Sequence, residues 1–193
     1  MHFILLRWVI VLKVGELIRK FKTRDSKDVL LRSPLWSDID DFLHFINSLV
    51  DEGADILANT KRTREDEVDF VSRLITNIER NRMISVVAEV EGHLIGHVEV
   101  TKKVGYASHV GLLGISVLKD YRDIGIGQEL MKEAETQAKN LGVEIIQLEV
   151  YSTNSRAIHV YEKLGYQVIG KIPKDIKREE GYRDSLIMVK ELI

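Results

Sequence analysis

The central motif of the chain reads Ile115-Ser116-Val117-Leu118-Lys119-Asp120-Tyr121-Arg122-Asp123-Ile124-Gly125-Ile126-Gly127-Gln128. It starts with apolar, β-branched residues typical of a buried strand and ends with two closely spaced glycines where a helix begins. Glycines let backbone N–H groups approach a ligand closely. A helix start adds about half a positive charge and several unpaired N–H donors. The motif therefore predicts a cradle for a pyrophosphate, to which Arg122 can add a charged contact.

Other interpretations of the two glycines are open. A P-loop requires Gly-Lys-Ser/Thr, whereas Gly127 is followed here by Gln128 and Glu129. A dinucleotide-binding fold requires G-x-G-x-x-G close to the strand end. Leu130 occupies the third glycine position, although Glu149 lies near the place of the ribose-binding acid. A loop that only turns the chain is the remaining alternative.

Outward from the motif, hydrophobic periodicity predicts the remaining elements. Helices are expected over 37–50, 64–80, 125–141 and 154–164. Strands are expected over 29–32, 84–90, 94–100, 109–117, 143–150, 166–172 and 185–192. Antiparallel hairpins come first and a β-α-β unit later, so the order predicts a mixed α/β sheet, mostly antiparallel, with helices on both faces.

The first 28 residues differ from the rest. Residues 17–23 alternate and 24–28 are turn-like, so this extension is expected to form a β-hairpin arm, leaving residues 29–193 as one domain. The run from Phe3 to Leu12 is apolar but contains Arg7 and falls short of the roughly 20 residues that span a membrane. We expect it to be a strand or a packing surface that suits a homodimer, in a cytoplasmic protein without membrane contact.

Composition excludes several classes of function. The chain of 193 residues has no cysteine, so disulfides, thiolate metal sites and cysteine nucleophiles are excluded. Lys plus Arg is 28 and Asp plus Glu is 30, giving a net charge of −2, which argues against a general nucleic-acid partner. No spacing of His, Asp and Glu suggests a metal.

A family resemblance rests on two blocks. Arg122-x-x-Gly125-x-Gly127, after a Val-containing strand, resembles the acetyl-CoA signature R/Q-x-x-G-x-G/A of the GNAT N-acetyltransferase family. Asn154, Ala157 and Tyr161-Glu162-Lys163-Leu164-Gly165-Tyr166 resemble the later family block "N…A…YEKLGF", and Asp184-x-x-x-Met188 matches a common ending. The resemblance covers about Val29 to Leu192 and is closest to archaeal and bacterial members, including ribosomal-protein alanine N-acetyltransferases.

The resemblance implies a GNAT fold and an acetyl-CoA cosubstrate. The strand ending at Val117 would splay from the next strand, and the pantetheine arm would fill the gap. Backbone groups of Ile115 and Val117 would pair with that arm, and the Val117 amide would polarise the thioester carbonyl. The pyrophosphate would lie on the amides of Asp123, Ile124, Gly125, Ile126, Gly127 and Gln128. The Asn154 side chain would bond to the end of the pantetheine.

The implied reaction is direct attack of a primary amine on the thioester. Glu149 matches the base position of the alanine N-acetyltransferases, and strand alternation places it opposite the core residues Ile146, Leu148 and Val150; a water relay or a merely solvated carboxylate is the alternative. Tyr161 is the candidate acid for the departing thiolate, or else a packed aromatic. A structural or surface role is favoured over catalysis for His97, His109 and Glu99.

The acceptor is left open by the sequence. In this family it would be lined by about 36–63 and 171–184, where Asp38, Asp40, Asp41, Asp51, Glu52 and Asp55 would suit a cationic amine such as a polyamine or basic peptide. Helix capping is the favoured interpretation of those acids. Two rival functions are a non-catalytic acetyl-CoA-binding regulator on the same fold and a dinucleotide-binding module.

Overall fold

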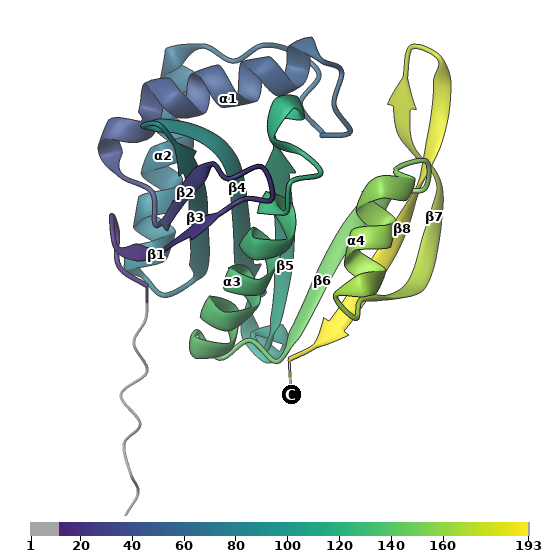
Figure 1. The fold of residues 1–193 in the computed structure, drawn as a ribbon. Coiled ribbons are helices and arrows are strands. Elements are labelled where there is room, and N and C mark those ends of the chain that lie inside the picture. The colour runs from purple at the N-terminus through teal and green to yellow at the C-terminus, as the bar shows by residue number, and fades with distance from the viewer. Residues whose placement is uncertain (1–11, 193) are drawn as a thin grey trace, which may run out of the picture.

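The computed structural model describes residues 12–192, in which helices lie on both faces of one eight-stranded sheet (Figure 1). The strands are β1 Leu17–Lys22, β2 Asp28–Arg32, β3 Met83–Val90, β4 His93–Lys102, β5 Val110–Val117, β6 Ile145–Tyr151, β7 Gln167–Arg178 and β8 Gly181–Glu191. The α-helices are α1 Ile39–Asp51, α2 Arg64–Glu79, α3 Ile126–Asn140 and α4 Ser155–Lys163, and short 3-10 turns are η1 Trp36–Asp38, η2 Gly105–Ala107 and η3 Lys119–Tyr121. The strand order is β1-β2-β3-β4-β5-β6-β8-β7, and only β5–β6 is parallel. The predicted mixed and mostly antiparallel architecture is confirmed.

Helices α1 and α2 cover one face of the sheet, at the level of β3 and β4. Each buries one apolar stripe, made by Phe42, Phe45 and Leu49 of α1 and by Val71, Leu74 and Ile75 of α2. Helix α2 begins with a capping box, in which the Thr63 hydroxyl accepts the Asp66 N–H and the Asp66 carboxylate accepts the Thr63 N–H. The start of α1 is fixed differently, because buried Asp38 accepts two hydrogen bonds from the Arg32 guanidinium of β2.

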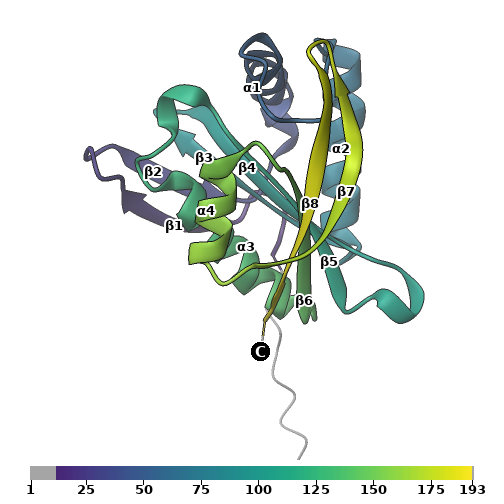
Figure 2. The same cartoon turned by 90° about the vertical axis from the view of Figure 1, so that its right-hand side faces the viewer.

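Helices α3 and α4 lie on the opposite face (Figure 2). Leu130, Met131, Ala134 and Ala138 of α3 are fully buried in the larger core cluster. Ala157, Ile158, Tyr161 and Leu164 of α4 pack against the same cluster. The two faces of the sheet therefore have separate hydrophobic cores.

The sheet divides between β5 and β6. These strands pair with each other only from Val110–Ile145 to Leu113–Leu148; beyond that point β5 continues to Val117 beside β4, and β6 continues to Tyr151 beside β8. Figure 1 shows the two ribbons diverging from that point. The splay implied by the family resemblance is present, and it begins at Gly114 and Glu149, the first residues beyond the last pair.

The last two strands are longer than predicted, since they form one hairpin that covers 167–191 instead of two strands ending at Ile172 and beginning at Ser185. Pro173 lies in the edge strand β7, where the register shifts between Ile172 and Ile176. A proline is tolerated at an edge bulge because no ladder N–H is needed there.

The N-terminal segment joins the same sheet. Strand β1 pairs with β2, and β2 pairs with β3. A domain boundary at residue 28 stays a prediction, and the strand or dimer surface expected from Phe3 lies outside the described residues except for buried Leu12. Among the helices of residues 12–192, none has the length and apolar character needed to cross a bilayer.

Candidate active site

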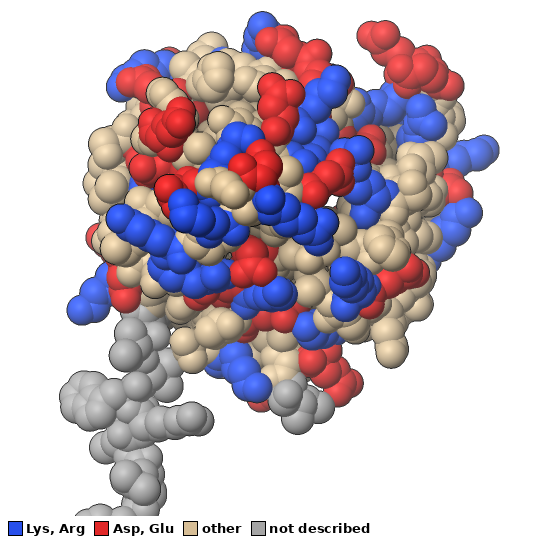
Figure 3. Space-filling model, in the orientation of Figure 1, with Lys and Arg blue, Asp and Glu red and all other residues tan. Residues whose placement is uncertain are grey.

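A cleft of about 1650 Å³ opens where β5 and β6 diverge. Strands β4, β5 and β6 form its floor, the α1–α2 segment covers one side, and the starts of α3 and α4 form the other. Every predicted site residue lines it except Ile124 and Ile126, and the Ile126 side chain is buried in the core. Acidic and basic side chains are interspersed over this face of the molecule (Figure 3).

The glycine loop presents a row of free amides. The first hydrogen bond of α3 runs from the Glu129 N–H to the Gly125 carbonyl, at 3.2 Å. The N–H groups of residues 123–128 have no acceptor among the described residues. Gly125 has a φ of +101°, and a Cβ there would project into open space. This arrangement fits an anion at a helix N-terminus.

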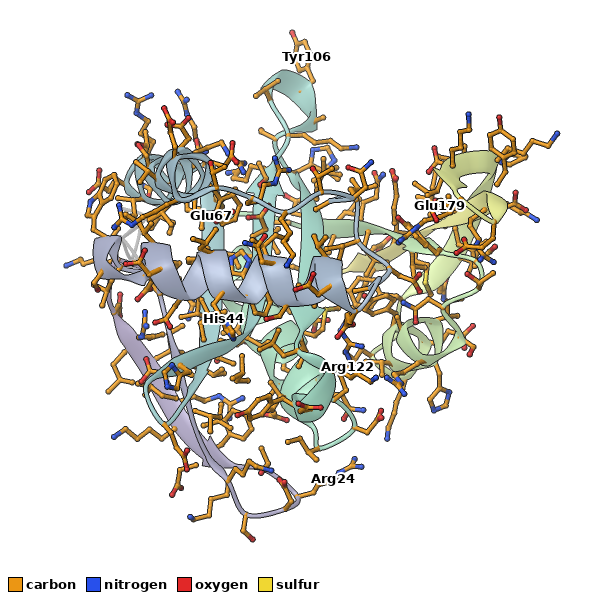
Figure 4. The ribbon with its side chains drawn as sticks, turned by 90° about the horizontal axis from the view of Figure 1, so that it is seen from above. Arg24, His44, Glu67, Tyr106, Arg122 and Glu179 are labelled. Atoms are coloured by element: carbon orange, nitrogen blue, oxygen red, sulfur yellow. The ribbon has the colours of Figure 1, made fainter. Side chains whose placement is uncertain are left out.

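Arg122 is held by the protein itself. Its Nε donates to the Val117 carbonyl at 2.8 Å, and its Nη2 forms an ion pair with Glu52 at the end of α1. Figure 4 shows Arg122 between α1 and the start of α3. The guanidinium thereby holds the glycine loop against the end of β5 and the end of α1. Its predicted contact with the pyrophosphate stays a prediction.

Ile115 and Val117 turn their backbone groups toward the gap. Leu118 N–H donates to the Ile95 carbonyl at 2.9 Å and Lys103 N–H to the Val110 carbonyl at 2.9 Å, so even-numbered residues of β5 bond to β4. In an antiparallel ladder the intervening residues point their N–H and C=O groups the other way. The odd-numbered residues therefore face the gap, where an extended ligand could bond as an added strand.

Helix α4 places Asn154 and Tyr161 on the cleft. Asn154 caps the helix through its side-chain oxygen, which accepts the Ala157 N–H at 3.1 Å. Tyr161 packs on the core, with its ring centroid 6.1 Å from that of buried Tyr166. Burial raises the pKa of Tyr161 to about 12, so its hydroxyl keeps a proton at neutral pH.

Two carboxylates flank one glycine at the opening of the gap. Glu149 is exposed and projects from the face opposite buried Leu148 and Val150. Glu99 of β4 lies directly across from Gly114 of β5, and its Oε2 is buried without a hydrogen-bond partner among the described residues. Burial raises the pKa of Glu99. Because Gly114 has no side chain, the space between the two acids stays open.

His97 lines the cleft, and its ring is held by contacts within the protein. Its Nε2 lies 2.7 Å from the Ser85 hydroxyl, and its ring meets Phe42 and Phe70 edge-on at 5.1 Å and 6.1 Å. Burial lowers the pKa of His97 to about 3, so the ring is neutral at physiological pH. His109 does not line the cleft.

The loop after α1 forms one wall of the cleft, and hydrogen bonds from β6 and β7 hold it in place. The Tyr151 hydroxyl at the end of β6 donates to the Ile56 carbonyl at 3.0 Å, and Arg178 of β7 donates to the Ala54 carbonyl at 2.7 Å. The Arg178 guanidinium also lies over the Tyr151 ring, at 5.4 Å. These contacts hold the loop after α1 beside Glu149.

Sequence reasoning missed several cleft residues, among them Gly114, Arg73 and Arg24. Gly114 had a usable signal, because a glycine inside a strand often marks a close approach. Arg73 shares a helical face with Asp66, Asp69 and Phe70. No signal in the neighbouring sequence indicates that this face lines the cleft. Arg24 reaches the glycine loop because its N–H donates to the Ile124 carbonyl at 3.3 Å, a contact set by tertiary pairing.

Comparison with known proteins decides the family. Residues 50–166 match the family model described as "Acetyltransferase (GNAT) family". The chain belongs to the GNAT acetyltransferase family. The predicted family, fold class and enzyme class, an N-acetyltransferase, are therefore confirmed.

Curated relatives match part of this GNAT chain. It is 32% identical over 107 residues to the L-amino acid N-acetyltransferase AaaT of Escherichia coli, covering 54% of this chain and 66% of the relative. It is 31% identical over 77 residues to the Escherichia coli [Ribosomal protein bS18]-alanine N-acetyltransferase, covering 40% of this chain and 52% of the relative. The matches thus span just under two thirds and about half of these relatives' lengths.

Solved structures share the fold. A GNAT acetyltransferase from Streptococcus pneumoniae superposes with a TM-score of 0.76 at 27% identity, covering 84% of this chain and 99% of that one. The structure of yncA from Salmonella typhimurium, solved with its cofactor acetyl-CoA, gives a TM-score of 0.75 at 16% identity, covering 86% of this chain and 94% of that one.

Proposed function

We propose that this chain is an acetyl-CoA-dependent N-acetyltransferase that moves an acetyl group to a primary amine by direct attack on the thioester. One observation carries the proposal. The free amides of residues 123–128 continue into the open edge of β5, and that edge ends between two carboxylates. An anion site, a slot for an extended arm and a place for an amine thus follow one another along one cleft.

The residues of the cleft fit acetyl-CoA in chemical type. Backbone N–H groups at the start of α3 suit the pyrophosphate. Ile115 and Val117 would bond to the pantetheine amides, and Asn154, whose side-chain oxygen caps α4, keeps its amide nitrogen for the ligand. Bound acetyl-CoA supplies the acetyl group as an activated thioester.

Each catalytic role follows from charge and position. The Val117 N–H faces the gap and would stabilise negative charge on the carbonyl oxygen. Glu149, or Glu99 across Gly114, would take the proton that the amine must lose. Tyr161, whose hydroxyl stays protonated, would give a proton to the leaving thiolate.

The acceptor is not defined by the relatives. One is named for L-amino acids and another for the alanine of a ribosomal protein, so free amino acids and protein N-termini are both represented. A primary amine is the common feature, and we propose no more than that at this level.

Calorimetric titration with acetyl-CoA and with NAD tests the cofactor. We expect acetyl-CoA to bind and NAD not to bind. Gly127→Glu places a carboxylate beside the free amides. Its φ is ordinary and its Cβ would lie 3.9 Å from Val117, so the chain should stay folded. The added charge should weaken acetyl-CoA binding at least about 10-fold. The matched control Thr136→Glu adds the same charge to an exposed position further along α3 and should bind normally. Unchanged affinity in Gly127→Glu would place the cofactor elsewhere.

A further inference from the structure

A half-buried acid and a guanidinium lie in the proposed acceptor half of the cleft without pairing. Glu99 of β4 and Arg73 of α2 both line it, yet no ion pair joins them or ties either to another described residue. Glu99 has one oxygen with no accessible surface and no hydrogen bond. A carboxylate oxygen and a guanidinium that both lack a protein partner within residues 12–192 suit a ligand that meets both.

A chain of contacts relates the two residues in space. The Arg73 guanidinium lies 5.2 Å from the Phe70 ring centroid, and the Phe70 ring lies 6.1 Å from that of His97. His97 and Glu99 are two residues apart on β4, so their side chains share a face. Arg73 also acts on Glu99 electrostatically, opposing the rise that burial causes in its pKa.

The stacking preorganises the guanidinium. A cation over an aromatic face is held by the ring quadrupole, which restrains the long side chain at the open side of the cleft. Arginine presents a planar fork of donors that matches a carboxylate in two parallel hydrogen bonds. The residue is exposed, so an incoming ligand reaches it without moving the core.

We propose that the acceptor is a free α-amino acid, with its carboxylate on Arg73 and its amine between Glu99 and Glu149 over Gly114. This inference rests on the proposed N-acetyltransferase function. In the reaction, the neutral amine nitrogen forms a bond to the acetyl carbon and the carbon–sulfur bond breaks. A carboxylate takes one proton from nitrogen, and the sulfur leaves as a thiol with a proton from Tyr161.

Other amines satisfy this site less well. A peptide N-terminus has an amide in place of the α-carboxylate, so it leaves the Arg73 charge unpaired. A polyamine brings a second ammonium toward a guanidinium, which is repulsive. In an α-amino acid the carboxylate carbon is two bonds from the amine nitrogen. This compact pair of opposite charges matches the carboxylate of Glu99 and the guanidinium of Arg73.

The test compares acceptors that differ only in the carboxylate. A mixture of L-amino acids is assayed against the corresponding amino-acid methylamides, simple peptides and a polyamine, with wild type, Arg73→Gln, Arg73→Lys and Arg80→Gln. Arg80 is exposed at the end of α2 and does not line the cleft, so it is the matched control. We expect kcat/KM to favour the acid over its methylamide by about 10- to 100-fold, the range for hydrogen bonds to charged groups. Arg73→Gln should remove that preference by lowering kcat/KM for the amino acid and not for its methylamide. Arg73→Lys should restore part of the preference, and Arg80→Gln should leave it unchanged.

Binding gives a second measurement that needs no turnover. N-acetyl amino acids and their methylamides are titrated into wild type and Arg73→Gln with CoA present. Tighter binding of the acid form, lost only in Arg73→Gln, supports the proposal. Equal binding or turnover of acid and methylamide, a better rate with peptides or polyamine, or an Arg73→Gln defect equal for both forms overturns it. Failure of every amine to release CoA would instead count against the acetyltransferase function, and the binding comparison would still decide the role of Arg73.

Discussion

Replacing Gly114 by valine probes the place where the amine is proposed to meet the thioester. Gly114 is the first residue of β5 beyond its pairing with β6, and it stands across from Glu99. An added Cβ would lie 3.9 Å from the Glu99 Cγ, which is ordinary van der Waals contact. Its φ is not in the left-handed region, so valine brings no backbone strain.

The size of the effect follows from the space that the side chain takes. Two further methyl groups would occupy the space over Gly114 beside Glu99 and displace an incoming amine. A misplacement of about 1 Å can lower the rate about 100-fold. The fold should be unharmed or gain about 0.5–1 kcal/mol, because glycine inside a strand is destabilising by that amount.

The assay measures three quantities on the same preparation: the kcat/KM for the amine, the Kd for acetyl-CoA and the midpoint of denaturant unfolding. We expect Gly114→Val to lower kcat/KM about 100-fold or more while the other two change little, and Gly114→Ala to give a smaller loss. Normal turnover in Gly114→Val would refute the placement of the amine over Gly114. A parallel loss of acetyl-CoA affinity would show that this glycine serves the cofactor instead.

Four further predictions concern single residues. Gly125→Ala forces a side chain to a φ of +101° and should lower stability by about 1–2 kcal/mol in urea unfolding; no loss would mean that the loop relaxes. Tyr161→Phe should lower kcat about 100-fold and spare acetyl-CoA affinity, and because the pKa of Tyr161 is about 12, the wild-type rate should show no loss of this acid up to pH 10; full turnover would remove Tyr161 from the reaction. Glu99→Gln should melt higher than wild type above the raised pKa of Glu99, since ionising the buried acid opposes folding, with the difference fading as the pH falls to 4; a difference independent of pH would contradict this. Asp38→Ala should cost about 3 kcal/mol, because it leaves Glu89 as the remaining ion-pair partner of the buried Arg32 guanidinium; a cost below 1 kcal/mol would show that this pair matters little.

Local signals explain why much of the fold was predictable. The glycines of the central motif, the Asn154 cap and the Thr63 start of α2 act within a few residues of themselves, so their effects appear in the sequence. Burial of Leu148 and Val150 likewise follows from strand alternation, which places Glu149 on the other face. The motif therefore predicts the row of free amides at residues 123–128 that the structure shows along the cleft.

The acceptor side depends on register and long-range pairing. That Glu99 lies across from Gly114 is a property of the β4–β5 ladder, and one residue of slippage would turn it to the other face. The partner of Arg122, Glu52, is 70 residues away, and Arg73 reaches the cleft only through the docking of α2. Sequence alone therefore does not show that Glu99 lies across from Gly114, and it ends at residue 172 a strand that continues as β7 to Arg178 past a register shift.

Release of the CoA thiol from acetyl-CoA, followed with a thiol reagent, tests the central claim most directly. The chain has no cysteine, so the protein adds no thiol of its own. The account predicts release that requires an added amine, equals the acetylated amine found by mass spectrometry, and is lost in Gly127→Glu but not in Thr136→Glu. No amine-dependent release from a protein that binds acetyl-CoA, across amino acids, peptides and polyamines, would contradict catalysis and favour a regulator that only binds the cofactor.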